Sequence, residues 1–198
     1  MHNTLNRNDM KKHFVLVIEH CEPNLSEWLM LEYKHVAKLW DDKILFTNAG
    51  DGKTAKALRS LGMVEKKKVK EVFRGKNCII LDPQSKKTLT TKDFAHLDAI
   101  IVGGILGYEK PKGRTKKLIS NKSGFETRNI GKIQLTIDGA VLVAKAISLG
   151  MKLSDIEITY EIEIVHDSVH STILPFGYPV IDNKPVITPG LIEYLVKK

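Results

Sequence analysis

The sequence predicts an α/β domain in which helices flank a parallel sheet, with a small β-rich edge in the last third. Short unbroken apolar runs at 13–18, 78–81 and 99–102 are typical of strands that are buried on both faces. Helical stretches separate these runs, and that alternation favours a parallel sheet. Residues 156–164 instead alternate between apolar and polar, which indicates an antiparallel strand with one exposed face.

The first half of the chain alternates strands and helices. Trp28, Leu29 and Val36 recur at helical spacing after Asn24 and Ser26, either of which can cap a helix. Gly103 and Gly104 end the last apolar run. The expected elements, in chain order, are a strand at 13–18, a helix after residue 24 or 26, a strand at 43–47, a helix from Gly52 to about Leu61, and strands at 78–81 and 99–102.

The last third predicts one more buried strand at 133–136, followed by a helix from Asp138 to Leu149 that Gly150 closes. Residues 182–185 form a turn signal between two short strands. Thr188 and Pro189 are expected to cap a final helix that runs through Val196.

Length and composition favour one globular domain. The 198 residues carry a net charge of +8, with 42 % hydrophobic and 27 % charged residues, so global disorder is excluded. We expect a polar N-terminal extension over 1–12 and a single domain over 13–198. Two cysteines without a paired motif fit a reducing compartment, and no apolar run is long enough to span a bilayer. A cytoplasmic protein without membrane contact is expected.

The positive charge is concentrated in residues 66–70 and 110–122. One interpretation is a solvated lysine-rich surface of the kind found in heat-adapted proteins. The other is a surface that steers the protein toward RNA or a ribonucleoprotein. Charge by itself does not separate the two.

The densest glycine cluster is Gly103-Gly104-Ile105-Leu106-Gly107, directly after a predicted strand. Ligands of open α/β sheets bind at the carboxyl ends of strands, where glycines let the backbone approach a ligand. The cluster predicts a small-molecule pocket, although a tight turn would also use these glycines. On the first interpretation, a side chain at position 104 would fill the ligand space and leave the fold intact.

Two other patterns carry less weight. Residues 47–54 resemble the end of a phosphate-binding loop, but Thr47 stands where that loop needs glycine, so a helix N-terminus is the better interpretation. His166 and His170 would suit a metal only on a helix, and the alternation before them indicates a strand. We therefore expect neither ATP binding nor a metal.

The end of the first strand is unusually polar, with Glu19, His20 and Glu22. Carboxylates at this edge of a parallel sheet would lie where active sites form. Alternatively, acids at this place favour the start of the following helix through its dipole.

These residues, taken with others along the chain, resemble a known family. Ile18-Glu19-His20 with Glu22, Leu81-Asp82-Pro83, the glycine cluster, and Gly131-Lys132-Ile133-Gln134-Leu135-Thr136 with Asp138 occur in this order. The pattern is similar to a small SPOUT methyltransferase family whose known yeast member methylates an arginine of a small-subunit ribosomal protein. The resemblance extends over nearly the whole chain.

The resemblance implies a trefoil-knotted α/β fold and bound S-adenosylmethionine. Two loops would form the walls of the cofactor site, with backbone groups near Ile133 and Leu135 reading the adenine, and Asn48 would line it with less support. The implied wall residues are Gly103, Gly104, Ile105, Leu106 and Gly107 on one side and Lys132, Ile133, Leu135 and Thr136 on the other.

The same resemblance implies an arginine acceptor. Glu19, Glu109 and Asp138 are the acids expected near the pocket, where they could orient a guanidinium and help remove its proton. Arg114 would instead suit an anion, either the cofactor carboxylate or an RNA phosphate. An acidic opening at Glu19 and Glu22 would attract an arginine and repel phosphates.

The expected partner is therefore a basic ribosomal protein or a ribonucleoprotein. RNA methylation, which most SPOUT relatives perform, and a non-catalytic ribosome-associated binding module stay open as alternatives. A monomer is favoured over a homodimer.

Overall fold

The computed structural model describes residues 14–40, 43–50, 52–108, 111–165 and 170–197. Its main sheet has six strands in the order β3-β2-β1-β5-β4-β6, and every neighbouring pair is parallel. In chain order the strands are β1 Val15–His20, β2 Ile44–Thr47, β3 Met63–Val64, β4 Cys78–Leu81, β5 Ala99–Gly104 and β6 Glu126–Arg128.

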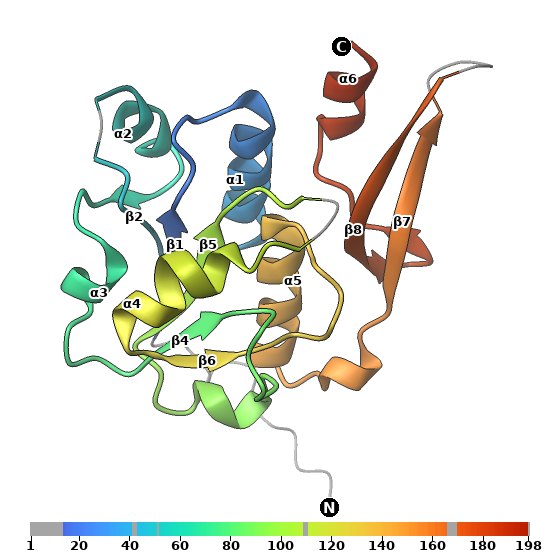
Figure 1. The fold of residues 1–198 in the computed structure, drawn as a ribbon. Coiled ribbons are helices and arrows are strands. Elements are labelled where there is room, and N and C mark those ends of the chain that lie inside the picture. Colours follow the sequence, from blue (N-terminus) through green and yellow to red (C-terminus); the bar gives the residue numbers. More distant parts are fainter. Residues whose placement is uncertain (1–13, 41–42, 51, 109–110, 166–169, 198) are drawn as a thin grey trace, which may run out of the picture.

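Helices cover both faces of this sheet (Figure 1). Leu16 and Ile18 of β1 belong to a core that includes α1 and α5, whereas Val17 faces the opposite core with Val69 and Ile119. This two-sided burial explains the unbroken apolar runs. The helices and helical turns are α1 Glu27–Leu39, α2 Gly52–Leu58, α3 Val69–Val72, η1 Thr91–Phe94, η2 Lys116–Ser120, α4 Asn121–Ser123, α5 Ile137–Ser148, η3 Leu153–Asp155 and α6 Leu191–Val196.

A second, antiparallel sheet follows α5, with strand order β7-β8-β9. Its strands are β7 Ile158–Val165, β8 Ser171–Ile181 and β9 Lys184–Pro185. Asp182 and Asn183 both have positive φ, of 51° and 59°, as a two-residue hairpin turn requires. Figure 1 shows this hairpin and α6 beside α1 and α5, at one side of the main sheet. The predicted β-rich edge is confirmed.

Most strands and helices agree with the sequence prediction, with shifted ends. The strand at 78–81 matches β4, and Ser26 caps α1 by accepting a hydrogen bond from the Leu29 backbone N–H at 3.2 Å. β1 begins and ends two residues later than predicted, because Glu19 and His20 continue the pairing with Gly103 and Gly104 of β5. The short strands β3 and β6 had no clear apolar signal.

Two expectations were wrong. Residues 133–136 form a loop rather than a strand, in which only Leu135 pairs with Gly177 of β8 as an isolated bridge. Thr188 does not cap the last helix, because α6 begins at Leu191 and the Thr188 hydroxyl instead donates to Asp138 at 2.6 Å. In both places a contact with a distant segment overrides the local signal.

No helix in the described part of the chain is long and apolar enough to cross a membrane.

Candidate active site

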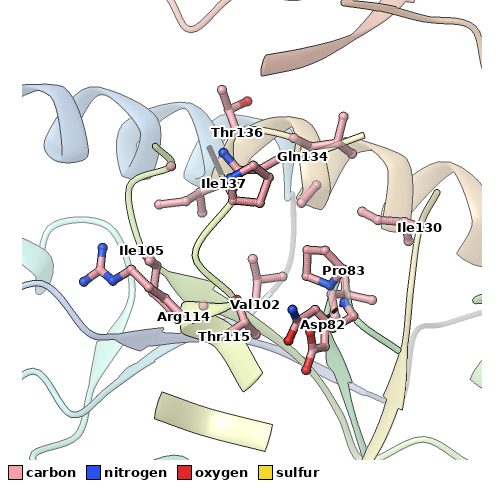
Figure 2. A pocket seen from close by; sticks show the side chains of 18 of the residues that line it. Asp82, Pro83, Val102, Ile105, Arg114, Thr115, Ile130, Gln134, Thr136 and Ile137 are labelled. Atoms are coloured by element: carbon pink, nitrogen blue, oxygen red, sulfur yellow. Dashed lines mark hydrogen bonds between the residues drawn. The ribbon is translucent and has the colours of Figure 1, made fainter. Parts of the chain in front are cut away.

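Three loops enclose a cavity at the carboxyl ends of β4, β5 and β6, which lie side by side in the sheet. Figure 2 shows Ile105 and Arg114 on one side of this space and Pro83 and Ile130 on the other. We call it the loop cavity. Its lining consists of residues 81–84, 102–103, 105–108, 111–115, 130–131, 133–137 and 140.

The structure brings many of the predicted site residues to this cavity. Both predicted walls contribute, and Arg114 joins them from the segment after the glycine cluster. The predicted residues that line the cavity are Gly103, Ile105, Leu106, Gly107, Arg114, Ile133, Leu135 and Thr136. Their roles toward a ligand stay predictions. Glu109 lies outside the described residues.

Gly104 does not face the cavity, which corrects the prediction made for it. A Cβ atom added there would overlap the Tyr33 hydroxyl of α1 and approach Ile18 Cγ2 at 3.1 Å. Gly103 borders the cavity, whereas Gly104 is covered by Tyr33 of α1 and by β1. A side chain at position 104 would therefore disturb the core and not fill the ligand space.

Asn48 and Lys132 also do not line the loop cavity. The Asn48 side-chain amide donates to the His20 backbone carbonyl at 2.6 Å, which joins the ends of β1 and β2. Lys132 is exposed to solvent. Asn48 follows β2, which does not border the cavity, and Lys132 lies between the lining residues Gly131 and Ile133, so the prediction was wrong for both.

Glu19 is buried and holds the fold together. Its side chain accepts hydrogen bonds from the Thr47 hydroxyl at 2.5 Å and the Val69 backbone N–H at 3.0 Å, which links β1, β2 and α3. Burial raises the pKa of Glu19, and these hydrogen bonds partly offset that rise. Glu19 is 4 % exposed and does not line the loop cavity, so the structure does not place it beside a ligand there.

Glu22 and Arg114 form an ion pair at the cavity edge. The Arg114 guanidinium donates from Nη1 at 2.6 Å and from Nη2 at 3.1 Å to the two Glu22 oxygens. Glu22 also accepts from the Leu106 backbone N–H at 2.9 Å, so the pair holds the glycine loop in place. The predicted acidic opening is thus absent from the described residues, because Glu19 is buried and Arg114 neutralises Glu22.

Asp138 is 1 % exposed and does not line the loop cavity. Its Oδ2 atom accepts from His35 Nδ1 at 2.7 Å and from the Thr188 hydroxyl at 2.6 Å. Burial by itself raises the pKa of Asp138, but the hydrogen bonds from His35, Thr136 and Thr188 lower it overall. Asp138 therefore joins α1, α5 and the segment before α6.

Sequence reasoning missed the wall supplied by β4. Asp82 and Pro83 follow this strand directly, and Asp82 is the single acid among the described lining residues. Its Oδ1 accepts from the Gln84 backbone N–H at 2.9 Å, and its Oδ2 accepts from the Ser120 hydroxyl at 2.6 Å. The same rule that selected the end of β5 would have found it, because β4 is the neighbouring parallel strand.

A second cavity adjoins the first. It is lined by Leu106, Gly107, Thr136 and Ile137, which the two cavities share, and by Trp28, Glu32 and Phe176. We call it the aromatic cavity. Glu32 Oε1 accepts from Trp28 Nε1 at 2.7 Å, and Oε2 accepts from the Ile137 backbone N–H at 2.9 Å. Burial, with the nearby Asp138 charge, raises the pKa of Glu32 to about 8.

This pKa predicts that stability falls as pH rises. Between about pH 4.5 and about pH 8 the folded protein keeps the Glu32 proton, whereas the unfolded chain releases it. The free energy of unfolding should therefore decrease by up to about 1.4 kcal/mol per pH unit from this group. Urea unfolding at several pH values across this range measures the slope. Glu32→Gln should flatten it, and equal slopes in both proteins would contradict the assignment.

Among the described residues, no group of three or more histidines, cysteines or acids is placed to hold a metal ion.

The parallel sheet, the loop cavity at its carboxyl edge and the added antiparallel sheet agree with a SPOUT-class methyltransferase fold, which the comparisons with solved structures support. The crystal structure of the dual-specific Trm10 from Thermococcus kodakaraensis has this fold, with a TM-score of 0.58 and 17 % identity over 72 % of this chain and 96 % of that one.

Residues 15–198 match the family described as "Protein arginine N-methyltransferase SFM1-like", and the chain belongs to this SFM1-like family. It is 29 % identical to the Saccharomyces cerevisiae protein arginine N-methyltransferase SFM1 over 205 aligned positions, which cover 92 % of this chain and 93 % of the yeast protein. The crystal structure of yeast SFM1 complexed with SAM has a TM-score of 0.83 and 26 % identity, covering 93 % of this chain and 90 % of that one.

Proposed function

We propose that this protein transfers a methyl group from S-adenosylmethionine to an arginine of a basic ribosomal protein. The observation that carries the proposal is the loop cavity, formed at the carboxyl ends of three adjacent strands in a chain of the SFM1-like family. Solved structures of yeast SFM1 hold SAM, SAH or MTA, and all three molecules contain a thioadenosine group.

The lining of the loop cavity fits such a cofactor. Apolar side chains from both walls can enclose an adenine ring, and the backbone of glycine-containing loops can approach its polar edge. Gly131 is one of these loop glycines: it lines the cavity with φ of 106°. A Cβ atom there would meet nothing within 4 Å, so the space beside its backbone is open to a ligand. Asp82 supplies a carboxylate for hydroxyl groups of a ribose. The apolar residues concerned are Ile105, Leu106, Ile130, Ile133 and Leu135.

The cofactor supplies an activated methyl group on a sulfonium. An arginine nitrogen forms the new bond to the methyl carbon, the sulfur–methyl bond breaks, and a proton leaves the guanidinium. The protein contributes mainly by holding the two groups in line, and such positioning can supply roughly 7–11 kcal/mol of the barrier. Arg114 supports this role indirectly, because its pairing with Glu22 fixes the loop that carries Leu106.

RNA is the second candidate acceptor. Lys112 lies at the edge of the loop cavity with its Nζ atom 3.8 Å from the centroid of the Tyr108 ring. Tyr108 is 46 % exposed, so an aromatic side chain and a lysine are available beside the site. This arrangement favours contact with nucleic acid, whether RNA is the acceptor or only surrounds a ribosomal protein.

One assay separates these acceptors. Labelled S-adenosylmethionine is incubated with the protein and ribosomal fractions, which are then treated with RNase or with protease. We expect the label in a basic ribosomal protein, resistant to RNase, lost with protease, and recovered as methylarginine after acid hydrolysis. Label that RNase removes and protease leaves would replace the arginine proposal with RNA methylation. Absence of any transfer, with S-adenosylmethionine bound, would favour a binding module.

A further inference from the structure

We propose that the aromatic cavity is the binding site for the acceptor arginine side chain, with the Glu32 carboxylate contacting its guanidinium between Trp28 and Phe176. The inference rests on the proposed function, because it names the substrate group and the residues that receive it. It is independent of which protein carries the arginine.

The position of the cavity is the first support. A methyl transferase needs its donor and acceptor in adjoining spaces, so that the reacting atoms lie within about 3–3.5 Å. The aromatic cavity shares Leu106, Gly107, Thr136 and Ile137 with the loop cavity. A side chain that enters the aromatic cavity therefore reaches the boundary of the loop cavity, where the methyl group would be presented.

The chemistry of the lining is the second support. Glu32 is the one acidic or basic side chain among the described residues of the aromatic cavity, and a cation that enters would favour its carboxylate form, so the site selects a cation over a phosphate. Each Glu32 oxygen accepts one protein hydrogen bond and has capacity for another, which matches the two parallel donors of a guanidinium. Planar guanidinium groups also stack on aromatic faces, which Trp28 and Phe176 supply.

The rigidity of the carboxylate is the third support. Trp28 and the N-terminal turn of α5 fix Glu32 from two sides, and Trp28 packs edge-on against Tyr194 of α6 at a centroid distance of 6.4 Å. Although burial by itself favours the protonated carboxyl, an entering cation favours the carboxylate, because opposite charges attract strongly where water is excluded. The carboxylate is thus held in place for a cationic ligand.

Tryptophan fluorescence tests the inference directly. The chain has two tryptophans, and Trp40 is buried in the main core, so Trp28 is the one that reports on the aromatic cavity. The protein is saturated with SAH and titrated with the peptide acetyl-Gly-Arg-Gly-amide. We expect a saturable change, and no change over the same range with the matching citrulline peptide, which has the same shape without the charge.

Variants then assign the effect to Glu32. Glu32→Gln should weaken binding of the arginine peptide at least about tenfold, because a charge-assisted contact is lost, and leave SAH affinity within about twofold. His35→Gln is the matched control, since it alters the same buried region through Asp138 but does not line the cavity, and it should bind the peptide like the unaltered protein. If Glu32→Gln does not fold, Phe176→Leu should still weaken peptide binding severalfold with SAH affinity retained.

The outcomes distinguish this inference from the proposed function. Methyl transfer by the unaltered protein, combined with equal peptide affinity in Glu32→Gln or in Phe176→Leu, would overturn the acceptor site and leave the methyltransferase function standing. Equal binding of the arginine and citrulline peptides would also overturn it. Stronger binding of cytidine than of the arginine peptide would assign the aromatic cavity to an RNA base instead. Failure of the unaltered protein to bind SAH would instead refute the proposed function.

Discussion

Gly104→Val should lower the free energy of unfolding by about 3 kcal/mol or more, because overpacking a well-filled core forces neighbouring groups apart. The added Cβ atom would overlap the Tyr33 hydroxyl, which lies 3.0 Å from His20 Nδ1 in a fully buried part of the α1 interface. Urea unfolding followed by circular dichroism measures the loss.

Gly52→Ala is the control for this experiment, since a Cβ atom there meets nothing within 4 Å. It should leave stability nearly unchanged or raise it slightly, because alanine is the better helix former. A Gly104→Val protein as stable as the unaltered one would show that β5 and α1 are not packed as described.

Gly107→Val should instead weaken S-adenosylmethionine binding roughly 100-fold, equivalent to about 2.7 kcal/mol, while the protein stays folded. Gly107 lies in an exposed part of the loop, and an added Cβ atom would overlap Phe176 and the Gln134 side chain, which line the aromatic cavity and the loop cavity respectively. Displacing the Gln134 side chain changes the wall of the loop cavity that the proposed cofactor needs.

Calorimetric titration with S-adenosylmethionine measures this affinity, and the unfolding midpoint of the same sample reports the fold. Gly107→Val is thus expected to lower cofactor affinity without loss of the fold, whereas Gly104→Val is expected to lower the free energy of unfolding. Retained cofactor affinity in a folded Gly107→Val protein would remove this end of the loop cavity from the proposed site.

The hydrophobic pattern determined the main sheet and much of the site's location. Unbroken apolar runs identified β4 and β5, because strands with helices on both faces contact no water. The glycine cluster at the end of β5 predicted a ligand site at the carboxyl edge of the sheet, and the loop cavity lies there, with Gly103 and Gly107 in its lining. These inferences depend on local periodicity and chain direction, which a sequence contains directly.

Tertiary contacts decided which side chains face that cavity. The sequence predicts Glu19 as a catalytic acid. In the structure its carboxylate instead accepts hydrogen bonds from Thr47 and from the Val69 backbone, both remote in sequence, and so joins three elements. The Asp138 carboxylate likewise accepts hydrogen bonds from His35 and Thr188, which are also remote in sequence. The number of partners that surround a buried carboxylate depends on segments that meet only in the folded chain.

The aromatic cavity is the clearest case. Trp28 is an apolar position of a predicted helix, and Phe176 lies outside the strands that the sequence predicted for the last third. The backbone N–H of Gly177, the residue after Phe176, donates to the Gln134 carbonyl at 2.8 Å and so attaches β8 to the loop between β6 and α5. Side chains more than 140 positions apart then share one wall, because packing between non-local segments, rather than local periodicity, sets their contact.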